Sequence, residues 1–271
     1  MKSVPSRIAA LAVLCAAFSA HAHDSWLAPS RDDSPPGEAV LELATGTRYP
    51  VQQFGQSFGS VARSGCIANG GGELALTPLH EHENWLDLVT KLAPGDAAPL
   101  ACWVELGAVD TLLEPKIVDV YFKDIRPPAA VRETWAALQA RKLPWRESYR
   151  KFARIELPAA AGTPAQSLAA ARQPLGLGLE IVVLGTAPIA VGQPLSFQVL
   201  RDGKALPGLS VELVSERNAF GVWRQSDANG QLRHSLPFSG RWLLRATELH
   251  PSIRTPDTWE SRFVTLAIEA R

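Results

Sequence analysis

Histidine occurs close to the start of the chain, in the run Ala20-His21-Ala22-His23-Asp24. The small residues Ala20 and Ala22 fit the pattern at which signal peptidase cuts. Cleavage after Ala22 makes His23 the first residue of the mature chain, where its free α-amine and its imidazole can chelate one transition-metal ion. The alternative is that His23 is incidental, because many exported chains begin with an arbitrary residue after such a signal.

A cut two residues earlier, after Ala20, would instead leave His21-Ala22-His23 at the start. An amino terminus with histidine third offers amine, backbone and imidazole nitrogens in one plane, which suits Cu(II) or Ni(II). Phe18 is the third residue before this cut and fits the recognition pattern badly, so we expect cleavage after Ala22.

Two further histidines lie close together in His80-Glu81-His82-Glu83. If this segment is extended, the two imidazoles point to one face and can share an ion. The alternative is a solvated loop of mixed charge before Trp85. His250 is expected in a loop after a strand; such loops can gather ligands, although a single loop histidine is usually only a polar residue. The candidate metal ligands are His23, His80, His82 and His250.

The sequence lacks the common catalytic signatures. It contains no hydrolase nucleophile elbow, no His-Glu-x-x-His zinc motif, no phosphate loop and no dinucleotide fingerprint, so we expect a protein that is not an enzyme. Several tryptophans lie in apolar patterns that predict a place in the core rather than on a sugar-binding surface. These are Trp103, Trp135, Trp223, Trp242 and Trp259. Glu260 is expected to pair with Arg245 or Arg262 inside the fold.

Residues 1–22 have the composition of a signal peptide. Lys2 and Arg7 form a basic start, and the apolar run over 8–17 is too short to span a bilayer. No second apolar stretch is long enough for a membrane helix, so we expect a periplasmic protein with no membrane insertion after cleavage. The whole chain has 27 basic and 27 acidic residues. No basic tract stands out, and nucleic acid is therefore not an expected partner.

Two of the three cysteines remain after removal of the signal, which contains Cys15. An even number in an oxidising compartment predicts a disulfide between Cys66 and Cys102. Such a bond closes a long loop and would contribute roughly 4 kcal/mol through loop-closure entropy. A two-thiolate metal site is the alternative, but neither cysteine has a nearby CxxC or CxxH partner.

The alternation of apolar and polar residues predicts an all-β protein, made of two antiparallel sandwiches of immunoglobulin or transthyretin type. The N-terminal β-rich domain covers 23–157 and includes one short helix near 128–142, with prolines at both ends. The apolar run 117–122 is rich in β-branched and aromatic residues and is expected to be a strand. A linker over 158–176 follows, rich in Ala, Pro, Gln and Gly, and the C-terminal sandwich covers 177–271.

Turn signals separate the strands of the C-terminal sandwich. They include Asp202-Gly203, Ser239-Gly240 and Asp227-Ala228-Asn229-Gly230. In the last of these, Asp and Asn can bond to their own backbone and Gly230 can take a positive φ. We expect a structural turn there rather than a calcium loop, because the EF-hand ligand pattern is missing.

The mature start His23-Asp-Ser-Trp26-Leu-x-Pro29 resembles the amino terminus of the NikM-like, nickel-uptake-related family of periplasmic proteins. The resemblance continues along the mature chain in Thr45-Gly-Thr-Arg-Tyr-Pro50, Trp145-Arg-Glu-Ser-Tyr149-Arg-Lys151, Gly221-Val-Trp-Arg-x-x-Asp227-Ala-Asn-Gly230, Gly240-Arg-Trp-Leu-Leu-Arg245 and Trp259-Glu-Ser-Arg-Phe263-Val-Thr-Leu266. Most members of this family are named only as a domain of unknown function. The resemblance implies a β-rich fold, a periplasmic location and metal handling, and the family's amino-terminal histidine maps onto His23.

These features predict a non-enzymatic periplasmic protein that binds or delivers a divalent transition metal, nickel or copper, through His23. A membrane transporter or an outer-membrane receptor is the expected protein partner. One alternative is a periplasmic β-sandwich interaction module without metal. Another is a copper-dependent oxidative enzyme with an amino-terminal histidine brace, which needs a second histidine on the same flat face.

The exported protein is expected to begin at His23, because Ala20 and Ala22 place the signal-peptidase site directly before it. Intact-mass measurement or amino-terminal sequencing of periplasmic material checks this start. A first residue at Asp24 or beyond would remove the histidine and exclude the terminal chelate.

Overall fold

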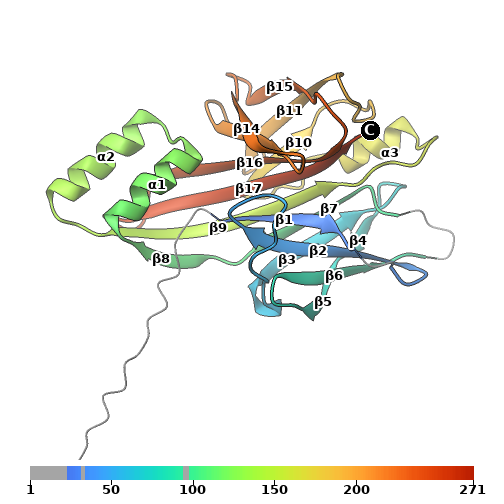
Figure 1. Ribbon diagram of the computed structural model, residues 1–271, viewed down its shortest axis with the longest axis horizontal. Coiled ribbons are helices and arrows are strands. Elements are labelled where there is room, and N and C mark those ends of the chain that lie inside the picture. Colours follow the sequence, from blue (N-terminus) through green and yellow to red (C-terminus); the bar gives the residue numbers. More distant parts are fainter. Residues whose placement is uncertain (1–22, 32–33, 94–97) are drawn as a thin grey trace, which may run out of the picture.

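The computed structural model describes residues 23–31, 34–93 and 98–271. The predicted signal peptide over 1–22, with Cys15 and His21, lies outside the described residues. Strands dominate the described chain (Figure 1), and the prediction of an all-β protein is confirmed. None of the helices in these ranges is long and apolar enough to cross a membrane.

The largest sheet has nine strands. In order across the sheet they are β14 (Asn218–Gln225), β13 (Ser210–Ser215), β16 (Gly240–Pro251), β17 (Trp259–Ala270), β9 (Trp145–Glu156), β7 (Ala101–Leu106), β3 (Val61–Ile67) and β4 (Glu73–Ala75), with β8 (Val109–Leu113) paired to β9. Neighbouring strands are antiparallel except β17 and β9, which are parallel. This parallel pair makes the sheet continuous across the segment 158–176, so the two predicted domains share it.

Two four-stranded sheets cover the opposite faces of the large sheet (Figure 1). The first consists of β1 (Asp24–Pro29), β2 (Glu38–Gly46), β6 (Trp85–Lys91) and β5 (Thr77–Glu81). The second consists of β10 (Leu179–Val183), β11 (Pro194–Arg201), β12 (Lys204–Ala205) and β15 (Gln231–Ser235). Side chains alternate along a strand, so Val104 of β7 packs in the core under the first small sheet and Trp103 in the core under the second.

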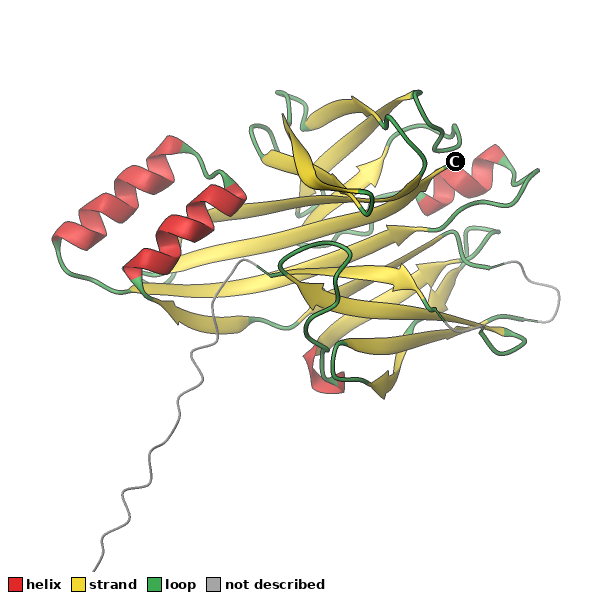
Figure 2. Cartoon of the chain, viewed as in Figure 1, coloured by secondary structure: helices red, strands yellow, loops and turns green. Residues whose placement is uncertain are grey.

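Two helices, α1 (Pro115–Ile125) and α2 (Ala129–Ala140), cover one end of the large sheet (Figure 2). Helix α2 confirms the helix predicted near 128–142. The strand predicted at 117–122 is wrong, because this run forms the middle of α1. Pro115 fits the first turn of a helix. The buried face of α1 has helical spacing and consists of Val118, Tyr121, Phe122 and Ile125.

A third helix, α3 (Ala165–Ala171), lies within the segment 158–176 that we expected to be an exposed linker. Alanine strongly favours the helix, and part of the helix surface is buried. Arg172 follows directly and is itself buried. Its guanidinium donates to the carboxylate of Glu156 at 3.0 Å and to the carbonyl oxygen of Gly185 at 2.8 Å. The segment is therefore attached to β9 through Glu156 and to the loop after β10 through Gly185.

Four of the five tryptophans expected in the core are buried there. They are Trp103, Trp135, Trp242 and Trp259. The prediction for Trp223 is wrong, because this residue lies on the edge strand β14 and is only half-buried. Its ring lies 4.3 Å from the Arg126 guanidinium, a cation–π contact at the molecular surface.

The predicted disulfide between Cys66 and Cys102 is confirmed. The two residues face each other on β3 and β7, with Cα atoms 4.0 Å apart. Both side chains are fully buried in the core under the first small sheet. The bond therefore crosslinks two neighbouring strands from within the core.

Thiol labelling of the unreduced, denatured mature protein is expected to detect no free thiol. The double variant Cys66→Ala/Cys102→Ala should lose roughly 2–4 kcal/mol of unfolding free energy, because the crosslink restricts the unfolded chain. Denaturant titration of the variant beside the wild type measures this loss. Two labelled thiols per wild-type chain would contradict the crosslink.

Candidate functional site

One face of the large sheet changes from apolar to polar where β1 begins. Ala153 of β9 and Leu243 of β16 belong to the core under the first small sheet. Two positions along each strand, and so on the same face, lie Lys151 and Arg245. These two cations come from strands far apart in the sequence, and they reach His23 and Asp24 at the start of β1.

His23 lies immediately before β1 and is half-buried. Its backbone carbonyl oxygen accepts a hydrogen bond of 2.8 Å from Nζ of Lys151. Its imidazole meets the ring of Phe54 edge-on, with centroids 4.9 Å apart. The residue predicted to become the amino terminus is therefore held at both its backbone and its side chain.

The ammonium group of Lys151 lies among aromatic side chains. It is 5.5 Å from the ring centroid of Tyr149 and 5.8 Å from that of Phe263. Burial lowers the pKa of Lys151 to about 8, while the negative charge of Asp24 acts in the opposite direction. From this largely apolar position, Nζ of Lys151 donates its hydrogen bond to the carbonyl oxygen of His23.

Asp24, the first residue of β1, is anchored through its own side chain. Its carboxylate is buried and forms an ion pair of 2.5 Å with Nη1 of Arg245. Nη2 of Arg245 pairs with Glu212 at 2.6 Å. Burial alone lowers the pKa of Arg245, but the two carboxylates outweigh burial and raise it, so the guanidinium stays charged. Behind Asp24, Oγ1 of Thr265 donates to the carbonyl oxygen of Ser25 at 2.6 Å.

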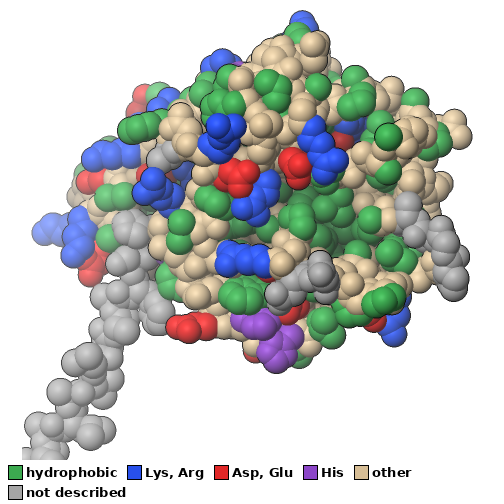
Figure 3. All heavy atoms as spheres, turned by 45° about the vertical axis from the view of Figure 1, so that its right-hand side comes forward, with side chains coloured by type: hydrophobic (Ala, Val, Ile, Leu, Met, Phe, Trp, Pro, Cys, Tyr) green, Lys and Arg blue, Asp and Glu red, His purple; other side chains and the backbone are tan. Residues whose placement is uncertain are grey.

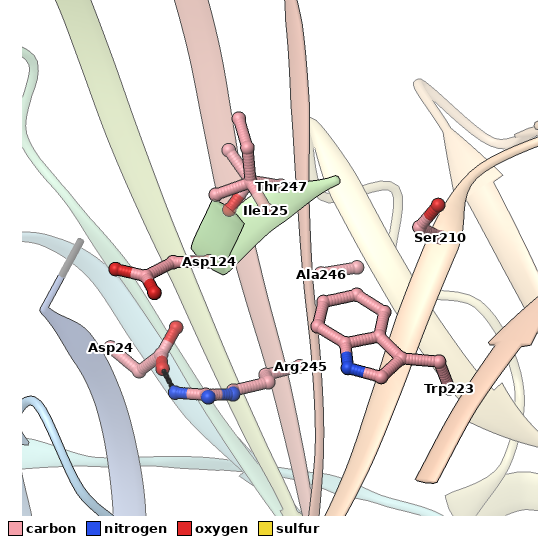
Figure 4. Close-up of a pocket in the computed structure, with 8 residues that line it drawn as sticks. All are labelled: Asp24, Asp124, Ile125, Ser210, Trp223, Arg245, Ala246 and Thr247. Atoms are coloured by element: carbon pink, nitrogen blue, oxygen red, sulfur yellow. Dashed lines mark hydrogen bonds and ion pairs between the residues drawn. The ribbon is translucent and has the colours of Figure 1, made fainter. Parts of the chain in front are cut away.

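A small pocket lies beside Arg245 (Figure 4). Its lining includes Asp24, Asp124, Ser210, Trp223, Arg245 and Thr247. In Figure 4 the two aspartates lie on one side of the pocket, and Trp223 and Ser210 lie on the other. The enclosed space is that of about one water molecule. The pocket is therefore too small for an organic substrate.

The structure brings two of the predicted ligands together at the edge of the first small sheet. The ring centroids of His80 and His82 are 4.5 Å apart. The imidazole of His82 also stacks on the indole of Trp85, with centroids 4.3 Å apart, and its Nε2 lies 2.7 Å from Oδ2 of Asp87. Histidine side chains form a patch at the lower edge of the face shown in Figure 3.

Residues 54 and 55 form a link between the two histidine positions. The ring of Phe54 packs on His23, and the backbone N–H of Gly55 donates to the carbonyl oxygen of Glu83 at 2.8 Å. A Cβ atom at Gly55 would collide with the carbonyl oxygen of His82, so glycine is required at this close approach. His23 and His82 therefore lie at the same end of the first small sheet, on either side of this segment.

His250 does not lie in a loop as we expected, because β16 extends through Pro251. It is half-buried and faces Glu260 on β17. It lies five residues beyond Arg245 on the strand, a distance of about 16 Å at roughly 3.3 Å per residue. The strand therefore carries His250 well away from the anchor of Asp24.

The predicted partner of Glu260 is also wrong. Its carboxylate accepts a hydrogen bond of 2.7 Å from Ser252 and lies 3.5 Å from Arg254. Arg245 is engaged by Asp24 and Glu212, and Arg262 pairs with Asp202 at 2.8 Å. Glu260 thus stabilises the β16–β17 hairpin loop rather than the interior.

Sequence reasoning missed Lys151 and Asp87 as partners of the candidate ligands. One local signal existed for Asp87, since it lies two residues after Trp85 in a strand and so shares its face. No local signal connects Lys151 with His23, because more than a hundred residues separate the two positions. Within 23–31, 34–93 and 98–271, no group of three or more His, Cys, Asp or Glu side chains is arranged to hold a metal ion.

Comparisons with known proteins add a family but no named activity. None of the curated proteins matches the chain. One solved structure that matches is native alpha-2-macroglobulin from Escherichia coli spanning domains MG0-NIE-MG1, at 14% identity. The match covers 81% of this chain and 93% of that chain, with a TM-score of 0.20. At this TM-score the similarity carries no structural argument.

The sequence also matches a family profile over residues 20–248. This span includes His23, Lys151, Arg245 and the hairpin with His80 and His82. It covers most of the 271 residues of the chain. The chain therefore belongs to the family described as domain of unknown function DUF4198.

Proposed function

We propose that the mature protein is a periplasmic metal-uptake accessory protein that binds a divalent transition metal, copper or nickel, through the α-amine and imidazole of His23. The observation that carries this proposal is the hydrogen bond from Lys151 to the carbonyl oxygen of His23. The motifs that resemble NikM-like nickel-uptake proteins support it as well. The disulfide between Cys66 and Cys102 fits an oxidising compartment such as the periplasm.

Preorganisation is the physical advantage of this arrangement. A flexible amino terminus loses conformational entropy when it wraps around an ion, and that loss weakens binding. Here Lys151 holds the carbonyl group of His23, and the ion pair of Asp24 with Arg245 holds the next residue. Neither of these two contacts involves the α-amine that signal cleavage creates, so they fix the main-chain position without competing with the ion for that nitrogen.

The donor set fits borderline transition metals. One amine and one imidazole nitrogen favour Cu(II) over Ni(II) and Zn(II) in the usual order of stability. We therefore expect the tightest binding in vitro for copper, whichever metal the cell delivers. A bound ion held at one end of the sheet suits transfer to a partner, and we propose a membrane transporter or an outer-membrane receptor for that role.

Titration calorimetry with Cu(II) is expected to lose its tightest binding event when the terminus changes. The proteins compared are the correctly cleaved wild type, His23→Ala, and a form of His23→Ala with one extra Met before position 23. Relative to His23→Ala, the extra residue moves only the α-amine. His250→Ala serves as the matched control and should bind like the wild type. Equal tight binding by all four proteins would rule out the terminal chelate.

Acidification should weaken this binding. Both nitrogens must lose their protons to ligate the ion, and in free peptides imidazole and α-amine titrate near ~6.5 and ~7.7. Copper affinity at the terminal site is therefore expected to fall steadily between pH 8 and about pH 5. Competition titrations across this range measure the effect, and a pH-independent affinity would contradict nitrogen ligation.

Lys151→Met should weaken the terminal site roughly tenfold, because the hydrogen bond from a charged donor that positions the backbone of His23 contributes about 1.5 kcal/mol and is lost. The exposed Lys91→Met variant carries the same chemical change away from His23 and should bind like the wild type. Circular dichroism confirms that both variants fold. Equal copper affinity of the two variants would remove Lys151 from the site.

A further inference from the structure

We propose that His80 and His82 form a second metal site, in which the two imidazoles chelate one divalent transition-metal ion such as Cu(II). This site lies on the β5–β6 hairpin and does not involve the amino terminus. It can therefore be tested independently of the terminal chelate at His23.

The spacing of the two rings fits a shared ion. An imidazole nitrogen ligates such an ion at about 2.0 Å, which places the ring centroid about 3.2 Å from the ion. Two imidazoles at a right angle, as in tetragonal copper sites, then have centroids about 4.5 Å apart. The centroids of His80 and His82 are 4.5 Å apart, with the ring planes inclined by 62°.

Asp87 prepares His82 for ligation. A carboxylate can only accept hydrogen bonds, so the 2.7 Å contact with Oδ2 of Asp87 places the hydrogen on Nε2 of His82. The lone pair of His82 is then on Nδ1. Metal-ligating histidines usually donate their second ring N–H to a carboxylate in this way, which fixes the tautomer and raises the basicity of the ligand.

Trp85 fixes both partners of this contact. Its indole N–H donates to Oδ1 of Asp87 at 3.0 Å, so the carboxylate is held by the strand that carries it. Its ring stacks on the imidazole of His82 at an interplanar angle of 20°. The side chain of His82 remains 31% exposed, which leaves a path for an ion from solvent.

The neighbouring carboxylate of Glu81 has another task. Its Oε1 accepts a hydrogen bond of 2.6 Å from the backbone N–H of Phe58. The proposed site uses the two imidazoles as its protein ligands, and water completes the coordination of the ion. Both sites supply two protein nitrogens. The terminal chelate takes both from one residue, whereas this site takes them from two residues, so we expect it to bind the ion more weakly.

The test uses a protein with one extra Met before position 23 and the substitution His23→Ala, so that the terminus has no imidazole for a chelate while His80 and His82 are kept. Calorimetric titration with Cu(II) is expected to show one ion per chain. His80→Ala and His82→Ala should each abolish this event, and electron paramagnetic resonance should lose the nitrogen couplings of the bound imidazoles. His250→Ala, the matched control on strand β16, removes a histidine away from the β5–β6 hairpin and should leave the event unchanged.

Variants of Asp87 test the role of the carboxylate. Asp87→Ala should weaken binding roughly 10- to 100-fold, the range found for carboxylate partners of ligating histidines. Asp87→Asn keeps an acceptor for Nε2 and should fall between Asp87→Ala and the wild type. Thermal unfolding of each variant identifies any loss of fold.

Two outcomes would overturn the second site. In the first, the extended protein binds no Cu(II); in the second, it binds one ion with unchanged affinity in both histidine variants. Neither outcome bears on the terminal chelate, because Cu(II) binding at His23 is measured separately in the correctly cleaved His82→Ala variant. Conversely, binding by the extended protein that depends on His80, His82 and Asp87 establishes the second site even if His23 binds nothing.

Discussion

The parallel pairing of β9 with β17 joins the two halves of the chain into a single sheet. Nine residue pairs link the two strands, from Trp259 opposite Glu147 to Ala267 opposite Ile155. The alternation of side chains gives the joined sheet two different apolar faces, each covered by one small sheet. The same alternation places Lys151 and Arg245 on the face beneath β1, so the joined sheet also anchors His23 and Asp24.

The buried ion pairs of Arg245 fix the position of β1, and burying these charges costs solvation free energy. Arg245 must lose most of its hydration to meet Asp24 and Glu212, and ion pairs of this kind add little net stability because desolvation offsets the attraction. Their geometry is nevertheless specific, since a misplaced β1 would leave a buried charge without its partner. Together, these ion pairs and the hydrogen bond from Lys151 hold His23 in a defined position in the fold.

Local sequence was sufficient where the physical cause is local. Asp227 and Gly230 form the predicted turn, with Oδ1 of Asp227 accepting from the backbone of Asn229 and Gln231 and with Gly230 at a φ of 71°. The prolines around α2 marked a helix, and two cysteines outside the predicted signal peptide predicted one bond. The all-β class followed from the period-two alternation of the strands.

Patterns in the chain were thus enough for the β-rich class, the disulfide, the turns and the histidines that are candidate ligands. The run 117–122 misled because a short apolar stretch fits a buried strand and a buried helix equally, and only packing against the end of the large sheet decided for α1. Partners were decided by tertiary structure alone: Lys151 for His23, Asp24 for Arg245, and Arg254 rather than Arg245 for Glu260. Such pairs depend on which strands become neighbours and in which register, and no local pattern in the chain encodes that choice.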